Sequence, residues 1–547
     1  MNETNGIAIV LSAHFPFVGH QEAGNHSEEE RFFGALSEIY LPLLDLFGRL
    51  EKDQVPYRVS IALSPVLCHL LGDDYLLERY LNYINRQIEF GAQEIERNKD
   101  NEALLRLSRW YYDQALDRRI AFTERYEKNI LKALNYYQRK RRIEILATAA
   151  SHAFLPFYVG QDESMQAQIE TALSSYRHCL GKYLLGFWLP ELGWTPEVEK
   201  YLRAYNFGYT IVESHALVFA DPPARCGSFY PAKTKEGLFL LGRDFYAQEL
   251  IEELSCDACY RDNKRDAGSE LTAQLLKVFA CPIDEGTTTG FKYWARDDRP
   301  ARYSAFGESL NEGHDRDEDA GSKRVYDRKA AEEKAQEHAG EFLAASIDRM
   351  NQAAFHLGTC SISVCCLDSD FLSRSWYEWP VFLEALFRKG AERSDLTFYT
   401  PTEFLYRQDS STFQTLVPEF SSWGSQGYAL AWLDSSNDWM YRHVMRALER
   451  MADLAEHFPN ESGLKERALN QAAREILLAM SSEWSKMIFN EESACYAQKQ
   501  VELSLRNFTT IYEALASNYI STEWLTNLER THKVFPHMNY RVFRKRR

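Results

Sequence analysis

Short apolar segments alternate along the first two thirds of the chain with longer segments whose apolar residues recur at helical spacing. Each apolar segment has four to seven residues and is apolar on both faces, a pattern typical of parallel strands covered by helices. The alternation predicts an α/β barrel. The predicted strands are Ile7–Ala13, Tyr57–Leu63, Ile143–Thr148, Leu184–Trp188, Tyr209–Val212, Leu238–Leu241 and Ile362–Leu367.

Two insertions and a helical C-terminal part complete the expected organisation. A long helical hairpin at about 74–140 interrupts the alternation, and a second insertion is expected at about 245–330, with loops at Ser255–Glu270 and Gly307–Asp327. After about residue 410 the strand pattern stops, and three helical patterns follow between residues 437 and 517. We therefore expect a barrel domain over 1–409 and a C-terminal helical bundle over 410–547.

Charge and hydropathy exclude several classes of partner. The chain carries 79 acidic and 63 basic residues, a net charge of -16, which repels the phosphates of nucleic acids. No run of about 18 apolar residues occurs, and Ile7–Leu11 is too short for a signal sequence, so we expect a cytoplasmic protein without a membrane partner. Aromatic residues reach 14%, which is compatible with stacking on sugars and equally with a core.

Candidate catalytic side chains follow the predicted strands, where parallel barrels place their active sites. Two carboxylates at such a rim suit glycosidic bond chemistry, in which one attacks the anomeric carbon and the other protonates the leaving oxygen. Carboxylates are also common in ordinary loops, and a histidine at a rim is as often structural as functional. The polar residues after the strands are His14, His152, Glu191, Glu213, His215, Asp368 and Asp370.

Several motifs resemble those of glycoside hydrolase family 57, in particular its 1,4-α-glucan branching enzymes, which are (β/α)7 barrels. The matching segments are distributed from one end of the chain to the other, so the resemblance extends over nearly its whole length. They are His14–Glu22, Glu144–Pro156, Phe187–Trp194, Leu367–Pro380, Ser421–Gly424 and Ser481–Trp484.

The resemblance implies a role for each matched residue. Glu191 would be the nucleophile and Asp368 the general acid/base. The remaining residues would bind the α-1,4-glucan substrate, and the chemistry would need no metal or organic cofactor. These implied substrate-binding residues are His14, His152, Trp423 and Glu483, with Arg261 and Trp294 as weaker matches.

This chain also departs from the family pattern. Ser12 replaces the first histidine of the opening motif, Ser373–Arg374–Ser375 replaces Gly-His-Trp, and Glu483 replaces an aspartate. The tyrosine-bearing loop that shields the intermediate from water is represented only by Leu254–Asp262. We expect glucan branching by double displacement. The alternatives are hydrolysis or α-1,4 transfer, as in an α-amylase or a 4-α-glucanotransferase, and a degenerate protein that only binds glucan.

Overall fold

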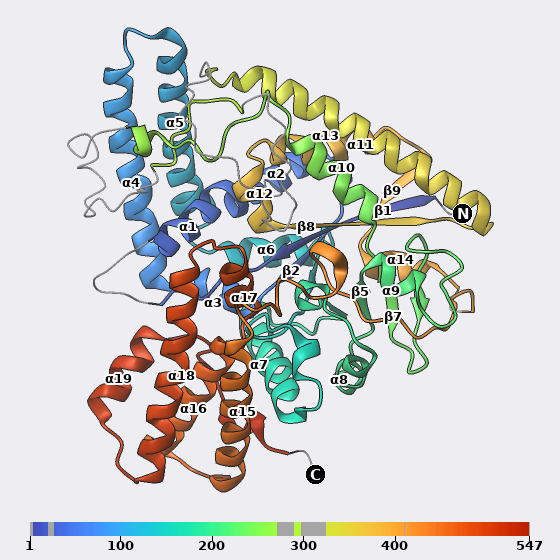
Figure 1. The fold of residues 1–547 in the computed structure, drawn as a ribbon. Coiled ribbons are helices and arrows are strands. Elements are labelled where there is room, and N and C mark those ends of the chain that lie inside the picture. The colour runs from blue at the N-terminus through green and yellow to red at the C-terminus, as the bar shows by residue number, and fades with distance from the viewer. Residues whose placement is uncertain (1–3, 20–26, 271–288, 297–323, 410, 546–547) are drawn as a thin grey trace.

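A ring of seven parallel strands forms the centre of the molecule in the computed structural model, which describes residues 4–19, 27–270, 289–296, 324–409 and 411–545 (Figure 1). One sheet has the order β3-β2-β1-β8 and the other β4-β5-β7. Parallel bridges from Ala147 to Phe187 and from Arg243 to Val364 join the two sheets at both ends. The bridges close the ring, as expected for a (β/α)7 barrel.

The seven ring strands correspond to the seven predicted ones, with shifted ends. Two further strands were not predicted: β6 lies antiparallel to β7, and β9 lies parallel to the start of β1. Both are only two or three residues long and, unlike the short β4, lie outside any longer continuous apolar segment. The strands are β1 (Asn5–Ala13), β2 (Val59–Leu63), β3 (Ile143–Leu146), β4 (Gly186–Phe187), β5 (Tyr209–Val212), β6 (Ala232–Lys233), β7 (Phe239–Gly242), β8 (Ile362–Asp368) and β9 (Leu396–Phe398).

Strand β4 is shorter than the predicted Leu184–Trp188, and its first residue must be glycine. A Cβ atom on Gly186 would lie 2.3 Å from the ring of Tyr209, a contact that no real side chain tolerates. The chain then leaves the strand and forms a short 3₁₀ turn at Pro190–Leu192. The turn places Glu191 directly above the end of the strand.

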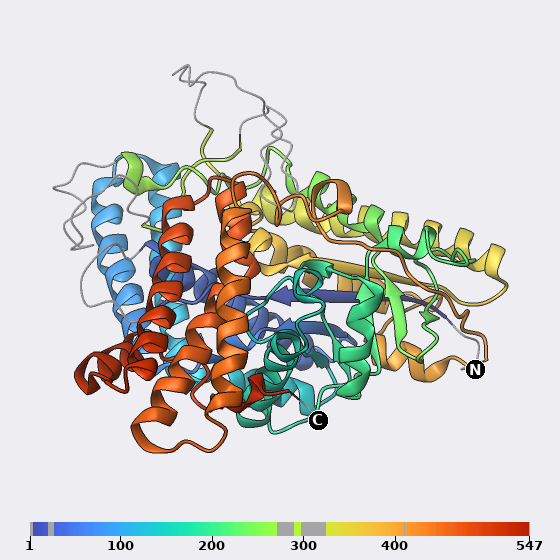
Figure 2. The ribbon, with the colours of Figure 1, turned by 60° about the horizontal axis from the view of Figure 1, so that its bottom comes forward.

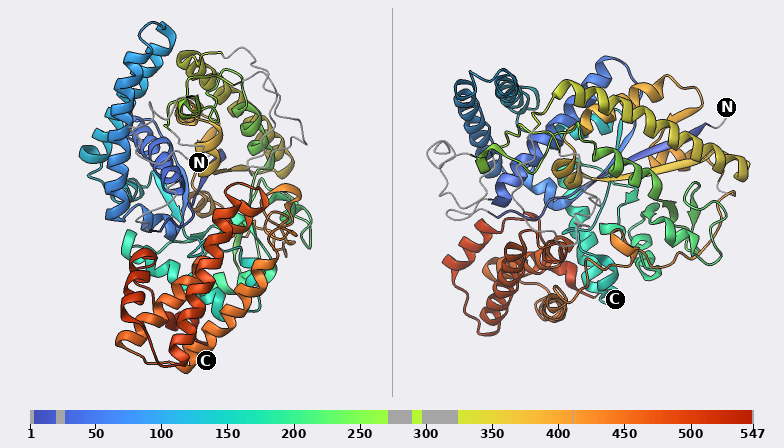
Figure 3. Two further views of the ribbon diagram at one scale, coloured as in Figure 1. Left: turned by 60° about the vertical axis from the view of Figure 1, so that its left-hand side comes forward. Right: turned by 45° about the horizontal axis from the view of Figure 1, so that its top comes forward.

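Helices surround the ring, and a long antiparallel pair extends from it. α4 and α5 form the predicted hairpin on one side, and the C-terminal helices lie on another (Figures 1 and 3). Part of the second predicted insertion, including the loop from residue 307 to 323, lies outside the described residues. The helices before residue 410 are α1 (Ser27–Ala35), α2 (Leu41–Lys52), α3 (Pro65–Leu70), α4 (Asp74–Arg97), α5 (Glu102–Ile120), α6 (Ile130–Arg139), α7 (Asp162–Leu180), α8 (Glu199–Ala204), α9 (Ser214–Val218), α10 (Phe245–Ser255), α11 (Arg328–Leu357), α12 (Ser369–Ser375), α13 (Trp379–Ala391) and α14 (Pro401–Arg407).

Between residues 437 and 517 the structure has four helices where the sequence pattern predicts three, and α19 follows them. Met480 and Ser481 interrupt the helical backbone, so the short helix α17 is separate from α16. These helices stand beside the barrel (Figure 2). None of the described helices is both long enough and apolar enough to span a bilayer. The helices of this region are α15 (Trp439–His457), α16 (Gly463–Ala479), α17 (Ser482–Phe489), α18 (Ala494–Ala516) and α19 (Thr522–Thr531).

Helix α17 is held against the barrel at its first turn. The backbone of Ser481 forms an antiparallel bridge with Ala153, and Ser482 N donates a hydrogen bond of 3.2 Å to His152 O. At the other side of the helix, the Asn437 side chain donates to Ser485 O at 3.1 Å. α17 therefore has a fixed position over the ends of β3 and β4.

Candidate active site

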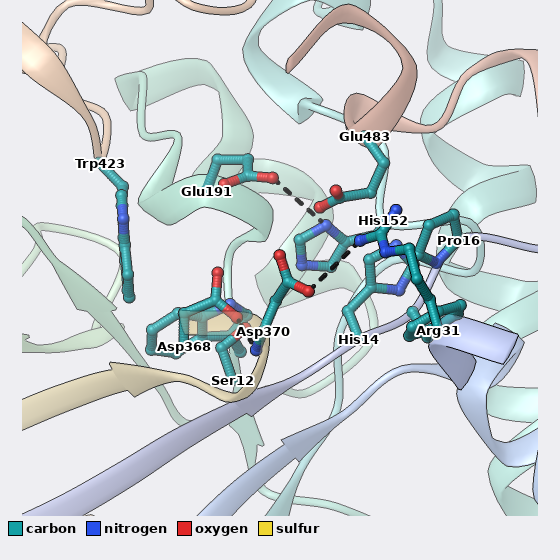
Figure 4. Close-up of a pocket in the computed structure, with 12 residues that line it drawn as sticks. Ser12, His14, Pro16, Arg31, His152, Glu191, Asp368, Asp370, Trp423 and Glu483 are labelled. Atoms are coloured by element: carbon teal, nitrogen blue, oxygen red, sulfur yellow. Dashed lines mark hydrogen bonds and ion pairs between the residues drawn. The ribbon is translucent and has the colours of Figure 1, made fainter. Parts of the chain in front are cut away.

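A small pocket lies where the carboxyl ends of β1, β3, β4 and β8 meet α17 (Figure 4). Six of the eight residues implied by the resemblance line it: His14, His152, Glu191, Asp368, Trp423 and Glu483. The other lining residues are Ser12, Phe15, Pro16, Arg31, Trp188 and Asp370. The structure thus brings together residues that are more than 450 positions apart in the sequence.

Glu191 is buried and occupies an unfavourable backbone conformation. It has φ of 58°, and Leu192 follows with φ of 49°, so two consecutive non-glycine residues lie in the left-handed region. Each such residue costs about 1–3 kcal/mol and persists only where the surroundings impose it. A hydrogen bond of 2.7 Å from Trp423 N to Glu191 O supplies part of that constraint. The strained turn fixes the direction of the Glu191 carboxylate.

Ser482 links Glu191 to His152. Its hydroxyl donates a hydrogen bond of 3.0 Å to Glu191 Oε1, and His152 Nδ1 lies 3.1 Å from the same hydroxyl oxygen. Because the hydroxyl has a single proton and gives it to Glu191, the histidine must donate from Nδ1. His152 Nδ1 itself is 3.7 Å from Glu191 Oε1. The first residue of α17 thereby orients the carboxylate and sets the tautomer of the imidazole.

Asp368 is the last residue of β8 and the N-cap of α12. Its Oδ1 accepts a hydrogen bond of 2.9 Å from Asp370 N, and its Oδ2 lies 3.7 Å from Lys486 Nζ. Burial raises the pKa of the Asp368 carboxyl; Lys486 opposes this shift and the negative charge of Asp370 adds to it. A raised pKa suits a carboxyl group that must deliver a proton.

Asp370 differs from Asp368 because it is paired with arginines. Arg374 lies 2.9 Å from one of its oxygens, and Arg31 lies 3.5 Å from the other. Burial disfavours the charged form, but Arg374, Arg31 and Lys486 outweigh it and hold the pKa of Asp370 below its ordinary value. Arg374, one of the residues that depart from the family pattern, therefore keeps Asp370 ionised beside the pocket.

Lys486 is a buried cation among four carboxyl groups. Burial alone would lower its pKa, but the charges of Glu483, Glu191, Asp368 and Asp370 outweigh burial and raise it. The same lysine lowers the pKa of Glu191, which burial and Asp368 raise. Glu483 has its pKa raised to about 8, first by burial and then by the neighbouring carboxylates, although Lys486 opposes the rise. Lys486 is thus a counter-charge shared by the whole cluster.

His14 and His152 form a stacked pair on the side of the pocket opposite Trp423 (Figure 4). Their ring centroids are 4.2 Å apart and the planes differ by 8°. Burial lowers the pKa of both rings, that of His152 to about 3, with a further contribution from Lys486. The rings are therefore neutral near pH 7. The Nε2 atoms of both are buried without a hydrogen-bond partner, which suits them to bind the hydroxyls of a sugar.

The same histidines and Glu483 are the residue types that bind metals. Each offers one ligand atom, and the three atoms lie within 4.8 Å of one another. A zinc ion needs bonds of about 2.0–2.2 Å to each ligand. Ligand atoms that are as far as 4.8 Å apart would have to move closer together to bind one ion. Chemistry based on two carboxylates requires no metal.

Two indole rings form the opposite wall. Trp423 and Trp188 meet edge to face with centroids 5.7 Å apart. Both are almost fully buried, at 3% and 1% exposure. Aromatic faces of this kind bind the apolar faces of sugar rings, so the pocket has one aromatic wall and one wall of hydrogen-bonding groups.

The structure places Arg261 and Trp294 away from this pocket. Arg261 is fully buried, its guanidinium 3.0 Å from Glu38 and 3.7 Å from the ring centroid of Tyr377. Trp294 packs against the core and forms a backbone bridge with Val325. Neither residue lines the pocket as far as the described residues define it.

Sequence reasoning gave no role to Ser482 or Lys486. Ser482 lies within the Ser481–Trp484 motif, and Lys486 is four residues further along the helix. Residues four apart share one face of a helix, so this spacing places the two side chains on the same side of α17. That face was recognisable from the sequence, but the carboxylates it meets come from distant strands.

Replacing Ser482 by alanine is expected to lower kcat about ten- to a hundredfold, because the charged carboxylate of Glu191 loses the hydrogen bond that the Ser482 hydroxyl donates to it. The acidic limb of the pH profile should move to higher pH, since that hydrogen bond favours the ionised carboxylate. Ser485→Ala is the matched control, because its hydroxyl donates to Ser482 O on the same helix at 2.9 Å. Equal effects of the two substitutions on kcat and on the pH profile would contradict the assigned role.

Comparison with known families agrees with this geometry. The model of "Glycosyl hydrolase family 57" matches residues 8–294, more than half of the chain. The model of "1,4-alpha-glucan branching enzyme, C-terminal" matches residues 443–543, the region that contains α17. A 1,4-alpha-glucan branching enzyme of Thermococcus kodakarensis is 25% identical over 521 residues, which cover 92% of this chain and 72% of the relative.

Solved structures extend the comparison to the whole fold. An α-amylase from Thermotoga maritima is 30% identical, with a TM-score of 0.88 and complete coverage of both chains. A branching enzyme of the family 57 type from Pyrococcus horikoshii shares the fold at 21% identity, with a TM-score of 0.85 over 99% of this chain and 97% of its own. On these matches, the chain belongs to glycosyl hydrolase family 57.

Proposed function

We propose that the protein is a 1,4-α-glucan branching enzyme that works by double displacement, with Glu191 as nucleophile and Asp368 as general acid/base. The observation that carries this proposal is the meeting of these two carboxyl groups, Glu191 buried and Asp368 half-buried, in one pocket between an aromatic wall and a pair of neutral imidazoles. The match of residues 443–543 to the branching-enzyme C-terminal model supports the choice of reaction, because α17 of that segment completes the pocket.

In the first step, Glu191 attacks the anomeric carbon of an α-1,4-linked glucose and forms a covalent ester, while Asp368 protonates the departing 4-oxygen. In the second step, Asp368 removes the proton from the 6-hydroxyl of an acceptor glucan, whose oxygen displaces Glu191 from the anomeric carbon. The bond broken is α-1,4 and the bond formed is α-1,6. His14, His152 and Trp423 would hold the sugar at the point of cleavage.

Hydrolysis is the second candidate, and a specific similarity favours it. The solved structure that is 30% identical over the complete chain is described as an α-amylase. Hydrolysis would use the same covalent intermediate, with water in place of the sugar hydroxyl in the second step.

Product analysis after incubation with amylose tests the proposal. We expect iodine staining to fall and α-1,6 linkages to appear, with only a small rise in reducing ends. Reducing ends that rise without new α-1,6 linkages would identify an α-amylase. Redistributed chain lengths with neither change would identify α-1,4 transfer. Binding of amylose without any product would identify a protein that only binds glucan.

A further inference from the structure

Two exposed aromatic residues begin helix α10 directly after β7. Phe245 is 41% exposed and Tyr246 is 64% exposed, and their ring centroids are 5.8 Å apart. The residue before them, Asp244, is buried and caps the helix by accepting a hydrogen bond of 3.1 Å from Ala247 N. Its other oxygen accepts a hydrogen bond of 2.6 Å from the Ser363 hydroxyl on β8. The pair is therefore held on a rigid helix end.

Arg243 connects this pair to the catalytic pocket. Its guanidinium carbon lies 5.5 Å from the ring centroid of Trp423 and 5.4 Å from that of Phe245. The arginine is only 3% exposed and forms an ion pair of 2.8 Å with Glu213, also buried. A buried guanidinium that is paired with a carboxylate has a fixed orientation. Arg243 therefore holds the ring of Trp423 in the pocket and the ring of Phe245 at the surface in fixed positions relative to each other. A series of ring–guanidinium contacts thus leads from Trp423 in the pocket wall, through Arg243, to Phe245 at the surface.

The pocket and its surroundings explain what this aromatic surface would bind. The pocket is small compared with a polymeric glucan, so most of such a chain must lie outside it. Glucan is uncharged, and rigid aromatic side chains bind such ligands at a low cost in conformational entropy. Single exposed aromatic residues are ordinary on protein surfaces. Here two of them are adjacent, rigid and linked to the substrate-binding tryptophan.

We propose that Phe245 and Tyr246 form an outer subsite that binds the part of an α-glucan chain extending from the catalytic pocket past Trp423. The subsite rests on the proposed function, since it takes the same substrate. It would strengthen the binding of long chains and contribute nothing to chains too short to leave the pocket. Chain-length preference would then depend in part on the first turn of α10.

Calorimetry on the Glu191→Gln protein tests the subsite without interference from turnover. In the Phe245→Ala/Tyr246→Ala double variant, we expect the Kd for a long linear maltooligosaccharide such as maltoheptaose to rise about tenfold relative to the Kd for maltose. Conservative exchange of the pair, Phe245→Tyr with Tyr246→Phe, should restore the difference. Phe355→Ala and Tyr519→Ala serve as matched controls, because Phe355 on α11 is 84% exposed and Tyr519, between α18 and α19, is 76% exposed, and neither should affect binding.

Three results would overturn the subsite. A double variant that binds maltoheptaose as tightly as its parent would show that the pair does not bind the chain. Equal weakening for the long and the short ligand would show a general disturbance of the pocket. If the Glu191→Gln parent binds neither ligand, the proposed function fails and the subsite fails with it, so the two failures are distinguishable.

Discussion

Exchange of Glu191 for glutamine is expected to lower the turnover of amylose by about 10⁴-fold or more, because the covalent step has no nucleophile. The fold should survive, since glutamine has nearly the same shape and its amide can still accept the hydrogen bond from Ser482. Activity is measured as loss of iodine staining, and folding as the melting temperature. Glu197→Gln is the matched control, because this nearby glutamate is exposed and should tolerate the change without loss of activity.

The companion substitution Asp368→Ala separates the two carboxyl roles. A maltosyl fluoride substrate has a leaving group that needs no proton, so the first step on it should survive the loss of the acid. We expect the Asp368 variant to release fluoride in a burst and then stall for want of a base, whereas Glu191→Gln should release none. Fluoride release by the Glu191 variant, or none by the Asp368 variant, would show that the roles are assigned wrongly.

Exchange of Lys486 for methionine is expected to move both limbs of the pH profile of kcat/KM to higher pH. The positive charge of the lysine lowers the pKa of Glu191 and of Asp368, so its removal lets both pKa values rise. Glu191 must be ionised to attack, and the acidic limb therefore moves up. Asp368 must be protonated to act as an acid, and the alkaline limb moves with it. Below the new pKa of Glu191, activity should fall about tenfold per pH unit.

Lys486→Arg is the control for this experiment, because it keeps the charge while changing the shape. It should leave the two limbs close to their wild-type positions even if it lowers the rate. Melting temperatures of both variants show whether each is folded. A methionine variant that is folded and slow, but has both limbs unshifted, would show that Lys486 does not set the charge balance of the site.

The barrel was predictable because its strands are buried on both faces. Such strands leave continuous apolar segments, and all seven were recognised from them. Strands β6 and β9 were missed because they are short and, unlike the equally short β4, do not lie within a longer continuous apolar segment. The pattern predicts three helices between residues 437 and 517 where the structure has four, and only Met480 and Ser481 separate α16 from α17.

Site residues were predictable where a motif fixes them beside a strand end, as for Glu191 and Asp368. The role of Lys486 could not be predicted, because Glu191, on the turn after β4, and Asp368, at the end of β8, are more than 100 residues away in the sequence. Arg374 shows the same dependence on distant contacts. In the sequence, Arg374 is one of the residues that depart from the family motif and so suggested an altered active site. In the structure, it forms an ion pair with Asp370 and compensates the negative charge of that carboxylate.

The most direct test is to identify the residue that carries the covalent intermediate. The Asp368→Ala protein is incubated with maltosyl fluoride, stopped with acid and digested, and the peptides are analysed by mass spectrometry. Double displacement at this pocket predicts a maltosyl adduct on the peptide that contains Glu191, absent when Glu191 is also changed to glutamine. An adduct on another carboxylate such as Glu483 or Asp370, or fluoride release without any adduct, would contradict the account.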